Sequence, residues 1–472
     1  MTYIDTDVCV IGAGSGGLSV AAGAAQFGVQ VVLIERDTMG GDCLNTGCVP
    51  SKALLAAAHA AQSVRNAAAL GILAGQPQVD FAAVRRHVHG TIAAIAPHDS
   101  QERFEGLGVT VLRASARFID HRTVDVEGTV VRAKRFVVAT GSRPALPDVP
   151  GLAEVPFLTN ETIFAQTTLP RHLVVVGGGP IGCELAQAFR RLGGEVTVLA
   201  RSRLLPREDP DLSAVVAARL RAEGVDLREH TTLTRVARQG EDVAVSLSHG
   251  GTLEGSHLLI ATGRTPIVEG LGLDRAGVAV GMAGIVVDHR LRTTNRRIYA
   301  VGDVAGQGQF THLAGYHASR VVQSMLFRLP VWGKGAAIPR VTYTDPELAQ
   351  VGLSESQARA LHDGTVRVLT APFADNDRAR CEGRMDGLLK VVTTRRGRVL
   401  GAGVVGAQAG DLLAPWILAV EGAVSLRSLA GMVVPYPTRG EVTKRAAGTY
   451  YKESLFSDRT RAVVRFLMRL AR

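Results

Sequence analysis

A strand, a glycine-rich turn, a helix and a second strand follow one another twice in this chain. The copies are DVCVIGAGSGGLSVAAGAAQFGVQVVLIERD and HLVVVGGGPIGCELAQAFRRLGGEVTVLARSR. Both carry G-x-G-x-x-G, made by Gly12, Gly14 and Gly17 and by Gly177, Gly179 and Gly182. In such a turn the first glycine allows the tight bend, the second lets a pyrophosphate approach the backbone, and the third lets helix and strand pack closely. The repeat predicts two dinucleotide-binding units of the doubly wound α/β class.

The residue that ends the second strand differs between the two copies. In the first copy Glu35 lies 23 residues after Gly12, where it is placed to accept hydrogen bonds from a ribose. In the second copy the residue at this spacing is Ala200, followed by Arg201 and Arg203. Arginines pair with a 2′-phosphate, which an acid would repel. We therefore expect the second unit to bind NADPH rather than NADH, the alternative being that both arginines only face solvent.

Three further stretches are expected to be strands that end close to a bound nucleotide. FVVATGSRP contains Thr140, Gly141 and Ser142, and LLIATGRTP contains Gly263; each follows one glycine motif and is expected to turn at its glycine. The third, in TTNRRIYAVGDVAG, ends near Asp303. An acid at the carboxyl edge of a parallel sheet lies where doubly wound folds bind ligands.

GGDCLNTGCVPSK places two of only five cysteines close together, Cys43 and Cys48. No second pair or nearby histidine completes a zinc set, so no metal site is expected and redox catalysis is favoured. A reactive thiolate needs a positive, partly sheltered setting, which a helix beginning near this motif would supply. Cys9 and Cys183 are expected to be packed in the interior, and Cys381 to be a free thiol without a redox role.

The composition excludes several other classes of protein. At 472 residues the chain is too long for one core and is expected to divide into roughly two to four domains. It lacks an apolar run near the roughly 20 residues needed to span a bilayer, and its start lacks the features of a signal peptide. The cytoplasm is therefore the expected location. The net charge of +10 is not accompanied by a nucleic-acid-binding motif, so a basic enzyme is favoured and no nucleic-acid partner is expected.

Together these motifs resemble the flavin-dependent pyridine nucleotide–disulfide oxidoreductases, which include lipoamide dehydrogenase, glutathione reductase and mercuric reductase. VTVLARSRLLPRED and ATGRTP are most similar to the mercuric reductase branch. The resemblance implies two doubly wound nucleotide-binding domains and a C-terminal α+β interface domain, which forms a homodimer whose active sites use residues of both chains. The expected segments are an FAD-binding domain over 1–150 and 281–336, an NAD(P)H-binding domain over 151–280, an interface domain over 337–450 and a basic amphipathic helix over 451–472.

The resemblance also implies two sets of cofactor-binding residues. Those expected to bind FAD are Gly12, Gly14, Ser15, Gly17, Glu35, Lys52, Ala116, Thr140, Gly141, Ser142, Asp303, Thr311, His312, Leu313 and Ala314. Those expected to bind the nicotinamide cofactor are Gly177, Gly179, Pro180, Ile181, Gly182, Ala200, Arg201, Arg203 and Gly263.

By the same resemblance, Cys43 and Cys48 form a redox-active disulfide. Cys48 would be the charge-transfer thiol against the flavin, and Cys43 the interchange thiol that faces the substrate. Lys52 would reach towards the flavin and pair with Glu184. Electrons would pass from NADPH through FAD and the two sulfurs to an acceptor.

VVPYPTRGEVTK departs from the family pattern. Lipoamide dehydrogenase and glutathione reductase carry H-P-T-x-x-E, in which the histidine is the acid–base catalyst and the glutamate orients it. Here Glu441 matches, but Tyr436 stands in place of the histidine. An ordinary tyrosine titrates near ~10 and histidine near ~6.5, so a dithiol reaction through this residue would be slow. Tyr436 is a candidate catalytic residue, and the alternative is a packing role at the interface.

Mercuric reductase also has tyrosine at this place. The C-terminal cysteine pair of mercuric reductase is missing from the present sequence, so efficient Hg²⁺ delivery is not expected. The expected function is an FAD-dependent NAD(P)H:disulfide-type oxidoreductase that reduces an unidentified small molecule or small protein. One alternative is a dihydrolipoamide dehydrogenase-type enzyme. Another is a weakly catalytic redox-sensing flavoprotein that acts through a membrane or protein partner.

The tail, residues 457–472, is predicted to be a helix with Ser457 as its N-cap. Its apolar residues at helical spacing are Val463, Phe466, Leu467 and Leu470, and those on much of the opposite side are Arg461, Arg465, Arg469 and Arg472. The favoured interpretation is an apolar face packed on the protein's own dimer. The alternative is a peripheral contact with an anionic membrane surface.

Overall fold

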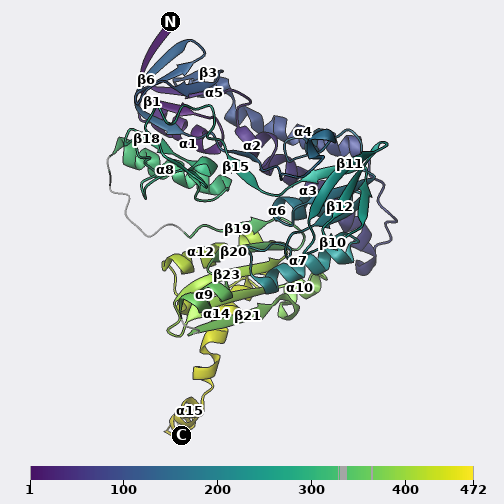
Figure 1. Cartoon of the computed structure of the whole chain (residues 1–472). Helices are drawn as coiled ribbons and strands as arrows, with labels where there is room; N and C mark the ends of the chain where they lie inside the picture. The colour runs from purple at the N-terminus through teal and green to yellow at the C-terminus, as the bar shows by residue number, and fades with distance from the viewer. Residues whose placement is uncertain (1, 328, 330–336, 363–364, 471–472) are drawn as a thin grey trace.

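The chain folds into three sheet-containing units and a projecting C-terminal helix (Figure 1). The computed structural model describes residues 2–327, 329, 337–362 and 365–470, so the predicted boundary at residue 336 and the side chain of Arg472 lie outside the described residues. Two units have parallel sheets at their centres, and the third has an antiparallel sheet. The predicted fold class is therefore confirmed.

The first unit is built on a seven-stranded sheet with the order β3-β2-β1-β6-β5-β4, in which β18 also pairs with β6. Although β18 follows the second unit in the chain, it pairs in parallel with β6 of the first unit. The strands are β1 (Thr2–Ile11), β2 (Val31–Ile34), β3 (Val109–Leu112), β4 (Ala116–Phe118), β5 (Thr123–Val126), β6 (Thr129–Val138) and β18 (Ile298–Ala300). The short strands β16 (Val280–Gly281) and β17 (Gly284–Ile285) pair with each other.

Helices α1 and α8 pack against each other beside this sheet, and a group of helices that begins with the thiol motif extends from it (Figure 1). The inner strands read as continuous apolar runs because both of their faces are covered. The helices are α1 (Ser15–Gln26), α2 (Gly41–Asn45), α3 (Cys48–Asn66), α4 (Phe81–Ile95), α5 (Gln101–Gly106) and α8 (Thr311–Leu326).

The second unit repeats this plan with a four-stranded parallel sheet of order β10-β9-β8-β14. Leu173 and Val175 of β8 pack with Phe189 of α6 in a fully buried cluster. The elements are β8 (His172–Val176), α6 (Pro180–Arg191), β9 (Glu195–Leu199), α7 (Pro210–Ala222), β10 (Asp226–Arg228) and β14 (His257–Ile260), with an antiparallel sheet of β11 (Leu233–Gln239), β12 (Asp242–Leu247) and β13 (Thr252–Gly255).

Two short antiparallel strands, β7 (Ser142–Pro144) and β15 (Arg264–Pro266), cross between the two units. Each follows a glycine with a left-handed backbone, Gly141 at φ +69° and Gly263 at φ +139°. Residues other than glycine rarely adopt this backbone conformation. The predicted turns at both glycines are therefore present, and they bring the carboxyl ends of the two sheets together.

The third unit has a five-stranded antiparallel sheet with the order β19-β20-β23-β22-β21. Its core contains the fully buried Trp416, whose Nε1–H donates to Thr443 Oγ1 at 3.3 Å. The strands are β19 (Arg340–Thr342), β20 (Glu347–Gly352), β21 (Val366–Pro372), β22 (Leu388–Thr394) and β23 (Val399–Gly406). The helices are α9 (Glu355–Leu361), α10 (Asp377–Cys381), α11 (Ala409–Leu412), α12 (Ala414–Glu421), α13 (Leu426–Gly431) and α14 (Glu441–Leu455).

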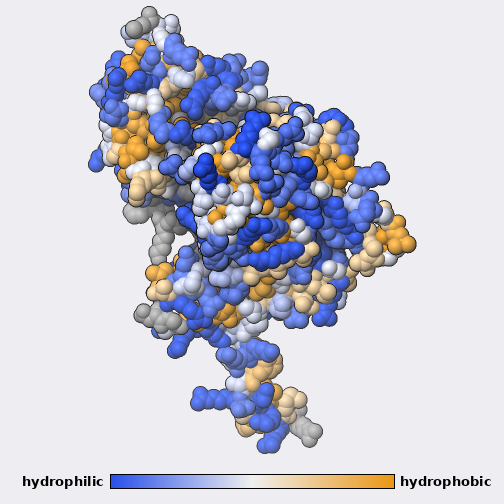
Figure 2. Space-filling model, turned by 45° about the vertical axis from the view of Figure 1, so that its right-hand side comes forward, coloured by the Kyte–Doolittle hydropathy of each residue, from blue (hydrophilic) through white to orange (hydrophobic). Residues whose placement is uncertain are grey.

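The predicted C-terminal helix is α15 (Asp458–Leu470), which projects from the third unit (Figure 1). Ser457 is its N-cap, since its Oγ accepts a hydrogen bond from the Thr460 N–H at 3.3 Å. No described residue of α15 is buried, and Phe466 is 60% exposed. Figure 2 shows hydrophobic and hydrophilic residues side by side on this projection. Among the described helices, none is both long and apolar enough to cross a membrane.

Candidate active site

A cavity of about 2330 Å³ lies where the carboxyl ends of the two parallel sheets meet. Most small-molecule sites occupy roughly 300–1,000 Å³, so this cavity has room for more than one cofactor. The predicted residues that line it are Gly12, Gly14, Ser15, Glu35, Cys43, Cys48, Lys52, Ala116, Thr140, Gly141, Ser142, Gly177, Gly179, Pro180, Ile181, Glu184, Ala200, Arg201, Arg203, Gly263, Asp303, Thr311, His312 and Ala314. The predicted residues outside its lining are Gly17, Gly182, Leu313, Tyr436 and Glu441.

The first glycine turn has the shape that a pyrophosphate requires. A Cβ on Gly12 would lie 2.4 Å from the Ala139 carbonyl oxygen, and a Cβ on Gly17 would lie 1.8 Å from that of Gly12. A Cβ on Gly14 would meet nothing within 4 Å, so this glycine faces open space. The N–H groups at the start of α1 lie directly after this opening, where they favour an anion.

The second glycine turn repeats the geometry. A Cβ on Gly177 would lie 2.2 Å from the Ala261 carbonyl oxygen, and one on Gly182 would lie 2.0 Å from that of Gly177. Gly179 again faces open space, and α6 begins immediately after it. Gly17 and Gly182 therefore act behind the cavity, through packing, which explains why neither lines it.

The two units hold different side chains after their second strands. The Glu35 carboxylate accepts hydrogen bonds from the backbone N–H groups of Ala13 at 2.6 Å and Asp37 at 2.8 Å, so it is fixed at the edge of the first turn. At the matching position of the second unit, Ala200 is buried and Arg201 is exposed beside the cavity.

Arg203 has its partners in the loop that follows β9 and in the first turns of α7. Its guanidinium donates to Ser213 Oγ at 2.6 Å and to the carbonyl oxygens of Leu205, Pro206 and Glu208 at 3.2, 3.0 and 2.5 Å. These bonds use most of its N–H groups and hold the loop that follows β9. Arg201 is thus the better placed of the two predicted arginines to meet a phosphate.

The thiol pair lies at the starts of two helices. Cys43 is in α2, and Cys48 is the first residue of the 19-residue helix α3, which is the helix predicted to begin near the motif. The Cys48 Sγ lies 3.3 Å from Thr311 Oγ1 of α8. Both cysteines are free thiols here, so the predicted disulfide stays a prediction.

The surroundings divide the two thiols by acidity. The pKa of the Cys48 thiol is lowered to about 6, above all by a hydrogen bond from Cys43 and then by the hydroxyl of Thr311. The Lys52 charge also lowers it, whereas burial and the Asp42 charge oppose this shift. The pKa of the Cys43 thiol is raised by the same hydrogen bond and by burial. Cys48 is thus the sulfur that carries the negative charge.

The predicted pair of Lys52 and Glu184 is present, with Nζ and Oε2 2.7 Å apart. Glu184 is buried, and its Oε1 accepts a hydrogen bond from the Tyr343 backbone N–H at 2.9 Å. The Lys52 ammonium lies 4.3 Å from the centre of the Tyr343 ring. Sequence reasoning missed Tyr343, although it lies in the stretch that was expected to open the interface domain.

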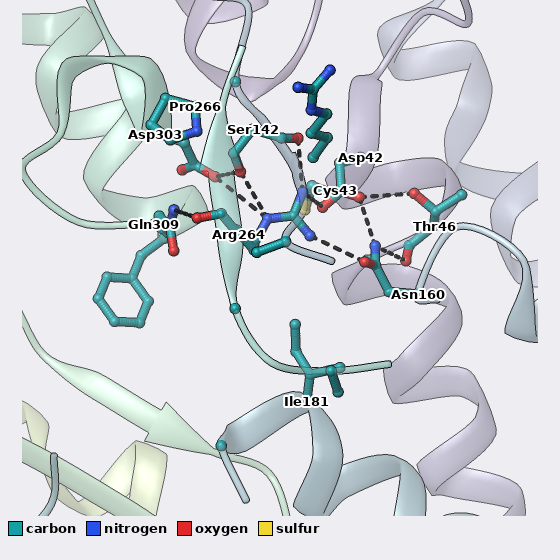
Figure 3. A pocket seen from close by; sticks show the side chains of 18 of the residues that line it. Asp42, Cys43, Thr46, Ser142, Asn160, Ile181, Arg264, Pro266, Asp303 and Gln309 are labelled. Carbon is teal, nitrogen blue, oxygen red and sulfur yellow. Dashed lines mark hydrogen bonds and ion pairs between the residues drawn. The ribbon is translucent and has the colours of Figure 1, made fainter. Parts of the chain in front are cut away.

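Polar side chains from distant segments meet around Asp303 (Figure 3). Ser142 Oγ donates to Asp303 Oδ2 at 2.5 Å, and burial raises the pKa of this carboxyl. Arg264 and Asn160 also line the cavity here and were not predicted as site residues. Arg264 lies in the motif ATGRTP, but the sequence analysis gave it no role of its own. No sequence pattern indicated Asn160.

Tyr436 and Glu441 lie away from the cavity of their own chain. Tyr436 is 71% exposed, and its hydroxyl donates to Asp377 Oδ2 at 3.1 Å, which raises the pKa of the phenol. Glu441 begins α14, and its Oε2 accepts a bond from the Thr438 N–H at 3.4 Å. Leu313 is also outside the lining, because it lies on the buried face of α8.

The other three cysteines lie outside the cavity lining. Cys9 and Cys183 are fully buried, as predicted, and burial raises the pKa of both thiols. Cys381 is an exposed free thiol at the end of α10.

Comparison with known families identifies two matching regions. Residues 6–318 match the family described as pyridine nucleotide-disulphide oxidoreductase, and residues 338–447 match the dimerisation domain of that family. The chain is 37% identical over 458 residues to a mercuric reductase of Streptomyces lividans, covering 94% of this chain and 96% of that one. It is 38% identical over 465 residues to a mercuric reductase of Shigella flexneri, covering 94% and 81%.

Solved structures of similar shape include a flavoprotein disulfide reductase. The Cu(II) complex of the HOCl-induced flavoprotein disulfide reductase RclA from Escherichia coli superposes with a TM-score of 0.84 at 28% identity, covering 93% of this chain and 98% of that one. LpdA from Mycobacterium tuberculosis superposes with a TM-score of 0.85 at 28% identity, covering 95% and 99%.

The Thr311 hydroxyl provides a test of the Cys48 environment. Thr311→Val removes a hydrogen bond to the thiolate, so we expect the pKa of Cys48 to rise from about 6 towards its ordinary value. In a Cys43→Ser, Cys381→Ser background, the rate of alkylation by iodoacetamide at pH 7 should fall roughly two- to fivefold.

The matched control is Thr234→Val, the same change on the exposed face of β11. Identical pH profiles for the Thr311 and Thr234 variants would contradict the assignment of Thr311.

Proposed function

The chain belongs to the pyridine nucleotide-disulphide oxidoreductase family, and we propose that it passes electrons from NADPH through FAD and the Cys43–Cys48 pair to a thiophilic metal ion. It is a flavin-dependent oxidoreductase with FAD and NAD(P)H as cofactors, and it forms a homodimer through its dimerisation domain. The observation that carries the proposal is the position of both thiols in one cavity with the two glycine turns.

Bound FAD supplies the two-electron relay between nicotinamide and sulfur. Residues of the chain would bind both cofactors. The two glycine turns would bind the pyrophosphates of FAD and NADPH, and Glu35 would accept hydrogen bonds from the ribose of FAD. The N-terminus of α3 and the Thr311 hydroxyl stabilise the Cys48 thiolate. Overall, one NADPH becomes NADP⁺ and H⁺ for each two-electron reduction of the acceptor.

A metal ion fits the site better than a small dithiol or disulfide. Those substrates need a proton acceptor beside the interchange thiol, and the raised pKa of Tyr436 makes it a poor one at neutral pH. A pair of sulfurs is itself a ligand set for soft metals. Two further findings support a metal ion as the acceptor. The S. lividans and S. flexneri relatives are named mercuric reductases, and the E. coli neighbour was solved as a Cu(II) complex.

Steady-state oxidation of NADPH with a panel of acceptors tests the proposal. Because the C-terminal cysteine pair is missing, efficient delivery of Hg²⁺ is not expected, but we expect Hg²⁺ or Cu²⁺ to support measurable turnover at the Cys43–Cys48 pair. Lipoamide and glutathione disulfide should be poorer acceptors. Cys43→Ala should lower the metal-dependent rate at least a hundredfold, because the interchange thiol then cannot bind the ion. Cys381→Ala, at an exposed thiol outside the cavity lining, is the control.

Faster turnover with lipoamide would instead favour a dihydrolipoamide dehydrogenase-type enzyme. Weak turnover with every acceptor would favour the redox-sensing flavoprotein. Metal-dependent turnover that survives in Cys43→Ala would refute transfer through the sulfur pair.

The preference for NADPH over NADH is proposed to rest on Arg201. It is exposed beside the cavity, directly after Ala200, which occupies the position of the acid in an NADH-binding unit. Arg203 is proposed to act indirectly, because its bonds to Ser213 and the loop carbonyls hold the backbone that carries Arg201.

Arg201→Ala should raise KM for NADPH roughly ten- to a hundredfold, as expected for the loss of charged hydrogen bonds worth roughly 1.5–3 kcal/mol. KM for NADH and kcat should change less than about twofold, since NADH lacks the 2′-phosphate. Arg228→Ala, at an arginine paired with Asp226 on β10, is the control. Equal effects on both cofactors would count against Arg201.

The dimer is proposed to include two further contacts. The exposed Tyr436 and Glu441, the first residue of α14, both lie in the dimerisation domain, from which they would complete the cavity of the second copy. The apolar face of α15, which projects beyond this domain, is proposed to pack on that copy. The segments predicted from the sequence remain our proposed domain boundaries, and the cytoplasm remains the proposed location.

Phe466→Ser with Leu467→Ser should weaken the dimer by roughly tenfold or more, because two large apolar side chains lose their burial. Sedimentation analysis over a dilution series would measure this, with Arg465→Gln and Arg469→Gln on the opposite face as the control. An unchanged dimer, combined with flotation on anionic liposomes that is lost in the arginine variants, would replace this packing by the membrane contact.

A further inference from the structure

A cluster of charged and polar side chains joins the helix of Cys43 to the crossing between the two nucleotide units (Figure 3). At its centre is Arg264, the first residue of β15, whose side chain is only 11% exposed. Its Nε donates to Ser142 Oγ at 2.7 Å, and its Nη2 donates to the Ser142 carbonyl oxygen at 3.0 Å. These bonds hold Arg264 against β7, the other crossing strand.

The same guanidinium faces two carboxylates. Its Nη2 lies 3.2 Å from Asp42 Oδ2, and its Nε lies 3.8 Å from Asp303 Oδ2. Its Nη1 also donates to Asn160 Oδ1 at 3.3 Å. Arg264 therefore places one positive charge between the segment before Cys43 and the acid at the edge of the first sheet.

Asp42 is the residue directly before Cys43, and both oxygens of its carboxylate have partners. Oδ1 accepts hydrogen bonds from Thr46 Oγ1 at 2.8 Å and from Asn160 Nδ2 at 2.9 Å, while Oδ2 faces Arg264. Asn160, which is buried, also donates to the Thr46 carbonyl oxygen at 3.2 Å. The short helix α2 is thus tied at both ends to residues of other segments.

The charge of Asp42 acts against the chemistry proposed for the thiols. A carboxylate near a thiol disfavours the thiolate, and Asp42 raises the pKa of Cys48 in this way. The Arg264 guanidinium, 3.2 Å from that carboxylate, carries the opposite charge and therefore opposes its field. The charged and titratable groups around Cys48 come from several elements. They are Cys43 and Asp42 on α2, Lys52 on α3 with its partner Glu184 on α6, Tyr343 from the third unit, and Arg264 with Asp303 at the crossing.

We propose that Arg264 is a positioning residue that neutralises Asp42 and fixes α2, so that the crossing between the nucleotide units sets the charge beside the thiol pair. The inference rests on the proposed role of Cys43 and Cys48. Its consequence is that the thiolate responds in opposite directions to the loss of Arg264 and the loss of Asp42. A purely structural Arg264 would lower the stability of the fold without this opposition.

The experiment titrates the Cys48 thiolate in four reduced holoenzymes: wild type, Arg264→Gln, Asp42→Asn and the double variant. The thiolate–flavin charge-transfer absorbance is followed against pH, and alkylation by iodoacetamide is measured in parallel. Arg264→Gln should move the titration to higher pH, and Asp42→Asn to lower pH. The double variant should return close to wild type, because both members of the ion pair are gone.

The size expected for Arg264→Gln is roughly a threefold or greater loss of alkylation rate near pH 6.5. Arg264→Lys keeps the charge but not the forked geometry, so its titration should lie between wild type and Arg264→Gln. Arg143→Gln is the control, since Arg143 lies on β7 and pairs with the exposed Glu269.

Shifts in the same direction, or no shift, in Arg264→Gln and Asp42→Asn would overturn the inference. If Arg264→Gln does not fold, an unshifted or raised titration in Asp42→Asn alone would overturn it too. Absence of the charge-transfer band in wild type would refute the proposed function, whereas the alkylation profiles would still decide the role of Arg264.

Discussion

A thiolate at the first residue of a long helix is the interaction on which the rest of this site depends. Cys48 begins α3, so its sulfur lies where unpaired backbone N–H groups favour negative charge. The Cys43 thiol and the Thr311 hydroxyl add hydrogen bonds to it from two other helices. With the pKa of this thiol lowered, the sulfur can stay charged at neutral pH where it lines the cavity.

The surrounding charges are arranged in pairs, which keeps that negative sulfur compatible with the nearby acids. Lys52 is matched by the buried Glu184, and Asp42 is matched by Arg264. A buried charge without a partner is costly, so each pair also protects the fold. Each pair joins a thiol helix of the first unit, α3 or α2, to a residue within 151–280, so both thiol helices are tied to the same neighbouring segment.

The two glycine turns show how one local geometry serves two cofactor sites. Steric exclusion of a Cβ at the first and third glycines, with open space at the second, is nearly identical in both copies. The difference between the sites comes from the next strand, where Glu35 is held by two backbone N–H groups and Ala200 is followed by Arg201. The two sites therefore share the geometry of the glycine turn and differ in the charge of the residues that follow the second strand.

The sequence by itself determined the fold class, both turns, the start of α3 and the pairing of Lys52 with Glu184, the last through resemblance to the family. These depend on glycine spacing, strand pattern and short motifs, whose physics is local. Only the tertiary structure decided that Arg203 serves its own loop, that Tyr343 lies over Lys52, and that Arg264 and Asn160 hold Asp42. Asn160 and Asp42 are separated by 118 residues in the sequence. Local sequence patterns do not predict which side chains from such distant segments meet in the folded protein.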